Sequence, residues 1–390
     1  MALSEHLDYP AAEESEYQPR TEYDGSSGYI QTGPLKETPK DFDALLRQFG
    51  YDPAQVRIVG HPRVARWQQR ARKMTWSDEH DRYIKTSVFE TVWLEAYRFH
   101  LAPVGNTSAA DLESLIAAAK PVSPAEVDGY WFVFQAGDLQ LGKRSRDGST
   151  EQIIEKFLES VQAAVLELKK CPVPIAGVQI SMPGDCVEGV VSQGSKNMWL
   201  TQETITEQTR ILRRLMLHVI DAFRTLVPKA YLDVVGGNHD QAQRMQNAYP
   251  GDNWATECAI AVSDALKMNP QAYGHVEVRV PQHWSGMMTV PVGDTNVCIV
   301  HGHQWRNENN MWKWLGEQAV NHQPAGGAHV IQSGHFHSWR LTSNEHKTHI
   351  QSPTFDCGSD WYREAHGATS TRGALVYLLR SGEVSRMSLV

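Results

Sequence analysis

Hydrophobic and polar positions follow two regular patterns in the C-terminal two thirds of this chain. From Tyr130 onward, apolar runs of strand length alternate with longer stretches in which apolar residues recur every three or four positions. The first pattern predicts buried strands and the second predicts amphipathic helices. The strand-like runs are 130–138, 174–185 and 230–240, and the helical stretches are about 150–170, 202–226 and 254–266. Short strands around Val276, Val290 and Val300 and a hairpin over 374–390 follow. This alternation predicts an α/β domain whose site lies at the carboxyl edge of a sheet.

Neither of these two patterns extends over the whole N-terminal third of the chain. Residues 1–37 are acidic and rich in Ser, Gly, Tyr and Pro, which predicts a mobile tail. We expect a small accessory domain over 38–125 and the main domain over 126–390. Near the start of the accessory part, Asp41 can cap a short helix. The residues on one face of that helix would be Phe42, Leu45, Leu46 and Phe49.

Two stretches of the accessory part can be interpreted in two ways. Six basic residues and no acidic one lie in 57–73, which also contains Trp67. This run is either a nucleic-acid contact or a solvated helix face. Further on, Phe89, Trp93 and Tyr97 recur every four residues, which fits one face of a helix or of a strand. We expect these aromatic side chains to be core, with a base-stacking surface as the alternative.

Charge and composition narrow the class of protein. The 390 residues include 37 Lys and Arg against 45 Asp and Glu, a net charge of −8. Seven of the acids lie within the first 28 residues, so the remainder is almost neutral and the acidity says little about partners. No apolar run approaches the roughly 18 residues of a membrane helix, and the N-terminus lacks the layout of a secretory signal. Five scattered cysteines without a CxxC pair argue against a disulfide framework or a structural zinc site. We therefore expect a cytoplasmic protein without a membrane partner.

Candidate chemistry follows five apolar runs of the main domain. Each run leads into a turn and then into residues of the types that ligate metals. The five segments are FQAGDLQLGK, SMPGDCVEG, VVGGNHD, IVHGH and SGHFHSW. Taken alone, each is equally well explained as a turn or a helix cap, since Gly, Asn and Asp are ordinary turn residues. Together they offer carboxylates, an amide and imidazoles, a donor mixture that suits Mn²⁺, Fe or Zn²⁺ and tolerates Mg²⁺.

The order D-x-(H/Q), GD, GNH, HGH and GHxH resembles that of the calcineurin-like metallophosphoesterases, over about 125–380. The resemblance implies a two-layer β-sandwich flanked by helices, with two divalent metals at its edge. Mn²⁺ is the expected metal, with Mg²⁺, Fe or Zn²⁺ as alternatives. By the same resemblance, the ligands of one metal would be Asp138, Gln140, Asp185 and His337. Those of the other would be Asp185, Asn238, His301 and His335, with Asp185 bridging.

The resemblance also implies a catalytic histidine, His239, which would face the scissile phosphate without ligating a metal. Two cations roughly 3.5–4 Å apart can clamp a phosphoryl group and activate a water for in-line attack. A histidine beside them can stabilise developing charge or protonate the leaving oxygen, and an acidic partner fixes its ring. Glu188 stands where relatives carry an Asp for that purpose, so His239 and Glu188 are the expected catalytic pair. His303 is open between a substrate contact and a structural role.

Two departures from the family pattern bear on the substrate. Protein Ser/Thr phosphatases carry an Arg after the acidic residue at 188, and Gly189 stands here, which argues against a protein phosphatase. The segment DLQLGK is similar to the opening motif of SbcD-type DNA repair nucleases, and the N-terminal part resembles phage-encoded members of the superfamily. Gln140 replaces the usual His of that motif, and a neutral amide oxygen binds borderline metals less well than imidazole.

These features predict a metal-dependent phosphodiesterase acting on nucleic acid, in the first place a DNA exo- or endonuclease. Lys143, Arg144 and Arg146 follow the first ligand segment and are the expected substrate contacts, together with His303. The alternatives are a small-molecule phosphodiesterase for cyclic or dinucleotides, a phosphomonoesterase, and a non-catalytic interaction module. The N-terminal region is also open to contact with a second copy of the chain or another protein.

Overall fold

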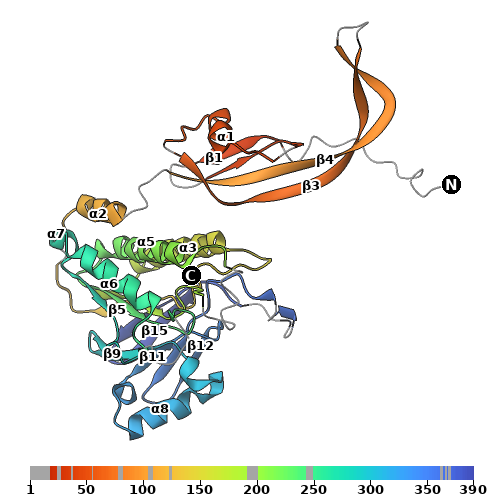
Figure 1. The fold of residues 1–390 in the computed structure, drawn as a ribbon. Coiled ribbons are helices and arrows are strands. Elements are labelled where there is room, and N and C mark those ends of the chain that lie inside the picture. The colour runs from red at the N-terminus through yellow and green to blue at the C-terminus, as the bar shows by residue number, and fades with distance from the viewer. Residues whose placement is uncertain are drawn as a thin grey trace. The chain divides into compact units, whose positions relative to one another are not determined.

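The computed structural model describes residues 18–23, 28–36, 38–54, 56–77, 82–103, 109–122, 125–190, 201–242, 249–360, 363–364, 367 and 370–390. Residues 1–17 of the expected tail lie outside this part. The chain forms two compact units, Met1–Asp111 and Leu112–Val390, whose elements are labelled in Figure 1. This division precedes the 125/126 boundary expected from the sequence.

The first layer of unit 2 is a six-stranded sheet in the order β15-β14-β5-β6-β7-β8. Its strands are β5 (Tyr130–Gln135), β6 (Ile175–Pro183), β7 (Ala230–Val235), β8 (Val276–Arg279), β14 (Leu375–Arg380) and β15 (Glu383–Leu389). Strands β5 to β8 run parallel, and β14 pairs antiparallel with both β5 and β15. The strands and the terminal hairpin predicted from the sequence are confirmed here.

The second layer is a five-stranded sheet in the order β12-β13-β11-β10-β9. Its strands are β9 (Met287–Val292), β10 (Thr295–Val300), β11 (Val330–Ser333), β12 (Arg340–Ser343) and β13 (Thr348–Gln351). Neighbours β10, β11 and β13 are parallel, whereas β9 and β12 pair antiparallel at the two edges. Strands β11, β12 and β13 are each four residues long. A strand this short contains too few apolar positions for the sequence pattern to predict it.

Helices cover the outer faces of both sheets. The predicted helices are confirmed as α3 (Thr150–Lys169), α5 (Ile205–Arg224) and α6 (Trp254–Leu266). The remaining elements are α2 (Ala109–Ala118), α7 (Pro270–Tyr273), α8 (Met311–Val320) and the 3-10 turns His303–Trp305, Glu308–Asn310 and Pro324–Gly327. In Figure 1, α3, α5 and α6 lie on one side of the paired sheets and α8 on the other. None of the described helices combines the length and apolar character needed to cross a membrane.

The period of two along each strand builds a separate core on each face of the six-stranded sheet. In β5, Phe132 and Phe134 face the helices, where both rings contact Phe223 of α5. Trp131 and Val133 of the same strand belong to the cluster between the two sheets. A third cluster joins the outer face of the five-stranded sheet to α8. Unit 2 is therefore a two-layer β-sandwich flanked by helices, the predicted fold.

Unit 1 consists largely of a long hairpin, β3 (Val56–Ser77) paired antiparallel with β4 (Arg82–Pro103). Two short strands, β1 (Arg20–Tyr23) and β2 (Gly28–Gln31), extend it in the order β1-β2-β4-β3. The prediction of a mobile tail is wrong for these two strands, because Ile30 is fully buried. The strands are too short for their apolar residues to form a recognisable alternating pattern in the sequence. Helix α1 (Phe42–Gln48) confirms the predicted cap, since Asp41 Oδ1 accepts a hydrogen bond from Ala44 N at 2.9 Å.

The hairpin shows that both ambiguous stretches are strands. The basic run 57–73 lies on strand β3, so the helix-face interpretation is wrong. The core expectation is right for Tyr97, which is 3% exposed, and wrong for Phe89 and Trp93, which are 46% and 48% exposed. The buried clusters of this unit combine β2, α1 and the ends of the hairpin strands nearest to them, so the aromatics further along β4 are not part of a core.

Candidate metal centre

Three loops that follow strands of the six-stranded sheet are joined by hydrogen bonds at the carboxyl ends of those strands. After β5, Asp138 N donates to Gly184 O at 3.0 Å and Gln140 N donates to Asp185 O at 2.8 Å, both in the loop after β6. After β7, His239 N donates to Asp185 Oδ1 at 2.7 Å. Asp185 therefore lies between the other two loops and contacts both.

The second sheet contributes to the same place. His335, after β11, donates its N–H to Asp138 Oδ2 at 2.8 Å. Gly334 N donates to the carbonyl oxygen of His301, after β10, at 2.8 Å. The five segments singled out in the sequence thus converge at the junction of the two sheets.

The backbone at this junction is strained. Nine non-glycine residues in the described part of the chain have positive φ, and five of them belong to the expected ligand set. These five are Asp138, Gln140, Asp185, His335 and His337, with φ between 48° and 75°. Left-handed backbone is unfavourable for residues with a Cβ and concentrates at functional sites. The concentration of strain indicates that these loops are shaped to direct side chains inward.

Glycine makes the close approach of the loops feasible. A Cβ on Gly237, in the GGNHD turn, would lie 2.1 Å from Asp185 Oδ1. A Cβ on Gly334 would lie 2.3 Å from Asp138 Oδ2. Asp240, the last residue of the turn, accepts hydrogen bonds from Gly237 N (2.8 Å) and Val187 N (3.0 Å), so it fastens this loop to its neighbour.

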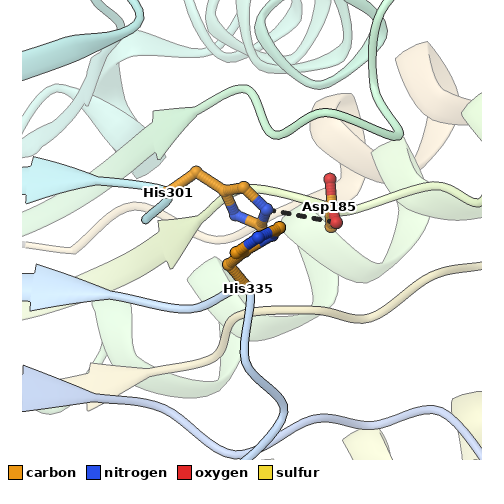
Figure 2. A group of neighbouring side chains, drawn as sticks. All are labelled: Asp185, His301 and His335. Atoms are coloured by element: carbon orange, nitrogen blue, oxygen red, sulfur yellow. Dashed lines mark ion pairs between the residues drawn. The ribbon is translucent and has the colours of Figure 1, made fainter. Parts of the chain in front are cut away.

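Asp185, His301 and His335 form the cluster best suited to hold a metal ion, with ligand atoms within 4.8 Å of one another (Figure 2). His301 is fully buried, and its Nδ1 lies 2.8 Å from the carbonyl oxygen of Pro183. When Nδ1 donates a hydrogen to that carbonyl, Nε2, which lies 3.1 Å from Asp185 Oδ2, is the ring nitrogen that would ligate a metal ion. Asn238 Oδ1 lies 3.2 Å from the same Nε2. One carboxylate, one amide oxygen and two imidazoles suit a divalent ion of the Mn²⁺, Fe or Zn²⁺ group.

The electrostatics of the cluster favour a positive charge beside Asp185. Burial alone would lower the pKa of His301, but the carboxylate of Asp185 raises it to about 9. Burial and the charge of His301 lower the pKa of His335 to about 3. Asp185 has a lowered pKa despite its burial, because His301 and His239 lie beside it. A proton on His301 therefore supplies the positive charge that a metal ion would supply when bound.

His239 lies next to this cluster with Glu188. Its Nδ1 is 3.2 Å from Glu188 Oε2, and its Nε2 is 4.0 Å from Asp185 Oδ2. Burial alone would lower the pKa of His239, but the carboxylates of Asp185 and Glu188 raise it to about 8. The imidazole is thus held between two acids, with 18% of its side chain exposed.

The second expected ligand set is arranged differently. His337 lies between two carboxylates, with Nε2 3.4 Å from Asp138 Oδ1 and Nδ1 3.4 Å from Asp356 Oδ2. The oxygen of Gln140 is 2.5 Å from Nζ of Lys143, whose ammonium also forms an ion pair with Asp356. Burial would lower the pKa of Lys143, but Asp356, Glu188 and Asp138 raise it. Lys143 was expected to contact substrate, yet its ammonium is directed into the ligand cluster.

The remaining expected contacts lie around the cluster. The ring of His303 is 5.5 Å from that of His301 and 6.2 Å from that of His335, between centroids. Burial and the charge of His301 lower the pKa of His303 to about 4. Arg144 and Arg146 are exposed, and Arg146 lies 3.6 Å from Asp360 and 3.9 Å from Asp147.

Sequence reasoning missed Asp356. Its carboxylate is fully buried and lies against both Lys143 and His337. Its sequence signal is weak, because only the short strand β13 and the residues SPTF precede it. A single Asp after an apolar residue gives no reason to expect a sixth contributing loop.

No protein-family model matches this chain, and no curated protein matches it either. Solved structures overlap it weakly. A conserved protein from Streptococcus pneumoniae, described as a phosphoesterase by prediction, is 11% identical over 65% of this chain and 86% of its own, with a TM-score of 0.30. An archaeal phosphodiesterase is 14% identical over 66% and 99%, also at 0.30. Vacuolar Protein Sorting 29 from Cryptosporidium parvum is 16% identical over 67% and 98%, again at 0.30.

Proposed function

We propose that this chain is a metal-dependent phosphoesterase that hydrolyses phosphodiester bonds. The observation that carries the proposal is the convergence of Asp185, His301 and His335 at the junction of two sheets, with ligand atoms within 4.8 Å. The motif order shared with the calcineurin-like metallophosphoesterases supports the same assignment. Five residues of the site have left-handed backbone conformations, which supports a functional site independently. Backbone strain of this kind persists mainly where function requires it.

The residues of the cluster would hold a divalent cation, with Mn²⁺ as the expected ion. Such an ion, when bound, stabilises charge on phosphoryl oxygens and makes water a nucleophile at neutral pH. Asp185 would offset part of the charge of the ion, His301 is oriented by the Pro183 carbonyl, and Asn238 would offer a neutral oxygen. The resemblance to the calcineurin-like family implies two ions, and binding of the second depends on Lys143, which contacts the Gln140 oxygen that this ion would need.

His239 and Glu188 are the proposed catalytic pair. A protonated His239 can donate its Nε2 proton to the leaving oxygen or stabilise charge on it. Glu188, 3.2 Å from Nδ1, fixes the ring and favours the protonated form. The pair is thus suited to cleave a phosphodiester, whose alkoxide leaving group needs a proton.

Nucleic acid, DNA in the first place, is the proposed substrate. Paired residues of β3 and β4 point to the same side of the hairpin in unit 1, so one face carries both arginines and aromatic rings, together with Glu95, whose Oε1 lies 3.2 Å from Arg66 Nε. We call this the Arg–aromatic face; it contains Arg66, Arg70, Phe89 and Trp93. Arg66 lies 4.5 Å from the ring of Trp93, and Arg70 lies 4.8 Å from the ring of Phe89. Exposed rings that stack bases, beside guanidinium groups that contact phosphates, are typical of single-strand binding surfaces.

The finer assignment is an SbcD-type nuclease of the cytoplasm. It rests on the similarity of DLQLGK to the opening motif of those enzymes and on the Arg–aromatic face. The exposed Arg144 and Arg146 follow the first ligand loop and would add phosphate contacts.

A substrate panel tests the proposal. The purified chain, with Mn²⁺, Mg²⁺ or Zn²⁺ added, is assayed against single-stranded DNA, duplex DNA, cyclic nucleotides and a chromogenic phosphodiester. Chelation and the variant His335→Ala serve as controls. We expect metal-dependent cleavage of DNA and of the chromogenic diester, both lost with the controls. Cleavage of cyclic nucleotides but not of DNA would favour the small-molecule alternative, and no metal-dependent cleavage of any diester would contradict the proposal.

A further inference from the structure

Lys143 is an unusual residue to find inside a ligand cluster for metal ions. Its side chain is 18% exposed, and its ammonium contacts the fully buried carboxylate of Asp356 and the oxygen of Gln140. An ammonium is a donor only and carries a full positive charge. The ammonium of Lys143 therefore places one positive charge of the protein itself in the loop after β5.

The contact with Gln140 conflicts with a second metal ion. Oxygen ligands bind first-row divalent metals at about 2.0–2.2 Å. An ion at that distance from Gln140 Oε1 would lie close to an ammonium that is itself 2.5 Å from the same oxygen. Like charges at such a separation repel strongly in a buried site. The residues of this position thus fit a protein cation better than a metal.

The surrounding side chains are consistent with a protein cation. His337 has a carboxylate near each ring nitrogen, Asp138 at 3.4 Å and Asp356 at 3.4 Å. Asp356 therefore serves two groups at once, the imidazole of His337 and the ammonium of Lys143. In contrast, among the described residues neither a lysine nor an arginine forms an ion pair with Asp185, which is paired with His239 and His301 instead.

We propose that the ammonium of Lys143, held by Gln140 and Asp356, takes the place of the second metal, so that the centre binds one divalent ion. That ion would be held by Asp185, Asn238, His301 and His335. The Gln at 140 and the Lys at 143 then form a matched pair, in which an amide oxygen accepts a hydrogen bond from the ammonium. The inference rests on the proposed metal-dependent function and determines how many ions that function uses.

Metal stoichiometry tests the inference without an activity assay. The wild-type chain, Lys143→Met, Gln140→His and the double variant are equilibrated with excess Mn²⁺, and the bound ion per chain is measured by elemental analysis after dialysis. Low-temperature electron paramagnetic resonance distinguishes an isolated Mn²⁺ from an exchange-coupled pair. Lys170→Met, at an exposed position, is the matched control, and Lys143→Arg keeps the charge if Lys143→Met fails to fold.

We expect one ion and an uncoupled signal in the wild type, Lys170→Met and Lys143→Arg, and two ions with a coupled signal in the double variant. Two ions in the wild type, or only one in a folded double variant, would overturn the role of Lys143. No bound ion in the wild type would overturn the proposed function as well. His335→Ala separates the two failures, because it removes the single ion if the cluster of Asp185, His301 and His335 is the site.

Discussion

Oε2 of Glu188 lies 3.2 Å from Nδ1 of His239, at the edge of the candidate metal centre. The two residues come from the loops after β6 and β7, which are joined by the hydrogen bond from His239 N to Asp185 Oδ1. Because Nδ1 faces the carboxylate, Nε2 is the ring nitrogen directed toward Asp185, at 4.0 Å. A change at Glu188 should therefore alter the acidity of His239 without removing a metal ligand.

Glu188→Gln tests this relationship through a pH profile. With His239 acting as an acid, the rate of diester hydrolysis should fall as pH rises through the pKa of His239, raised to about 8. Removing the Glu188 charge destabilises the protonated imidazole, so the variant should lose rate at a lower pH than the wild type. Stopped assays of a chromogenic phosphodiester across the pH range measure the shift. An unchanged descending limb would show that Glu188 does not set the acidity of His239.

His239→Ala should separate chemistry from metal binding. The imidazole is expected to act on the leaving oxygen and not on the ion, so the variant should keep its metal content. Turnover should fall by about 10²-fold or more, since general acid–base groups contribute on that scale. Elemental analysis and steady-state rates on the same preparation check both halves. Loss of metal together with activity would make His239 a ligand.

Asp185→Asn should abolish both metal binding and turnover. The Asn side chain can still accept the hydrogen bond that His239 N donates to Asp185 Oδ1 at 2.7 Å, so the loop contact is retained. It lacks the charge that the buried cluster offers to a cation, however. Bound Mn²⁺ per chain and the rate of diester hydrolysis are the two measurements. A variant that keeps its metal and a near-normal rate would exclude Asp185 as a ligand.

Some residues of the site could be predicted from the sequence and others could not. Asp185 lies two residues after β6, His301 directly after β10 and His335 two residues after β11, and parallel strands bring their carboxyl ends to one edge of their sheet. Their convergence could therefore be expected from order alone. The inward direction of Lys143 could not, because its partner Asp356 follows it by more than two hundred residues and has no motif around it.

Unit 1 was predicted less well for a different reason. The spacing of Phe89, Trp93 and Tyr97 fits both a helix and a strand, and only pairing with β3 decides between them. Burial could not be read from residue type either, since Tyr97 is 3% exposed and Trp93 is 48% exposed on the same strand. The difference depends on which part of the hairpin packs against α1 and β2, a tertiary property.

Charge reversal on the Arg–aromatic face tests the nucleic-acid assignment. Arg66→Glu with Arg70→Glu should weaken single-stranded DNA binding and make its salt dependence shallower, by roughly 0.7 in the log–log slope for each lost phosphate contact. Hydrolysis of a chromogenic diester should not change. Arg63→Glu is the matched control, because Arg63 pairs with Arg98 on the opposite face of the same hairpin. The basic run also contains Arg72, whose side chain lies outside the described part. Equal DNA affinity in all these proteins would favour a small substrate.

Gly237 lies in the turn between β7 and the expected catalytic histidine, His239. A Cβ at this position would lie 2.1 Å from Asp185 Oδ1 and 2.4 Å from Asp185 N, and a hydrogen bond from His239 N to Asp185 Oδ1 holds the two loops together. Gly237→Ala should therefore lower the free energy of unfolding by about 1–3 kcal/mol, the usual cost of overpacking.

The same change should weaken Mn²⁺ binding, because Asp185 would be displaced from His301. Gly316→Ala is the control: it lies in helix α8, with no atom within 4 Å of the added Cβ, and should stabilise the chain by roughly 0.5–1 kcal/mol. Thermal unfolding with and without Mn²⁺ measures both effects. If Gly237→Ala lost stability but kept wild-type Mn²⁺ affinity, the position of Asp185 would not matter for binding of the ion. The close approach at Gly237 would then serve the fold alone.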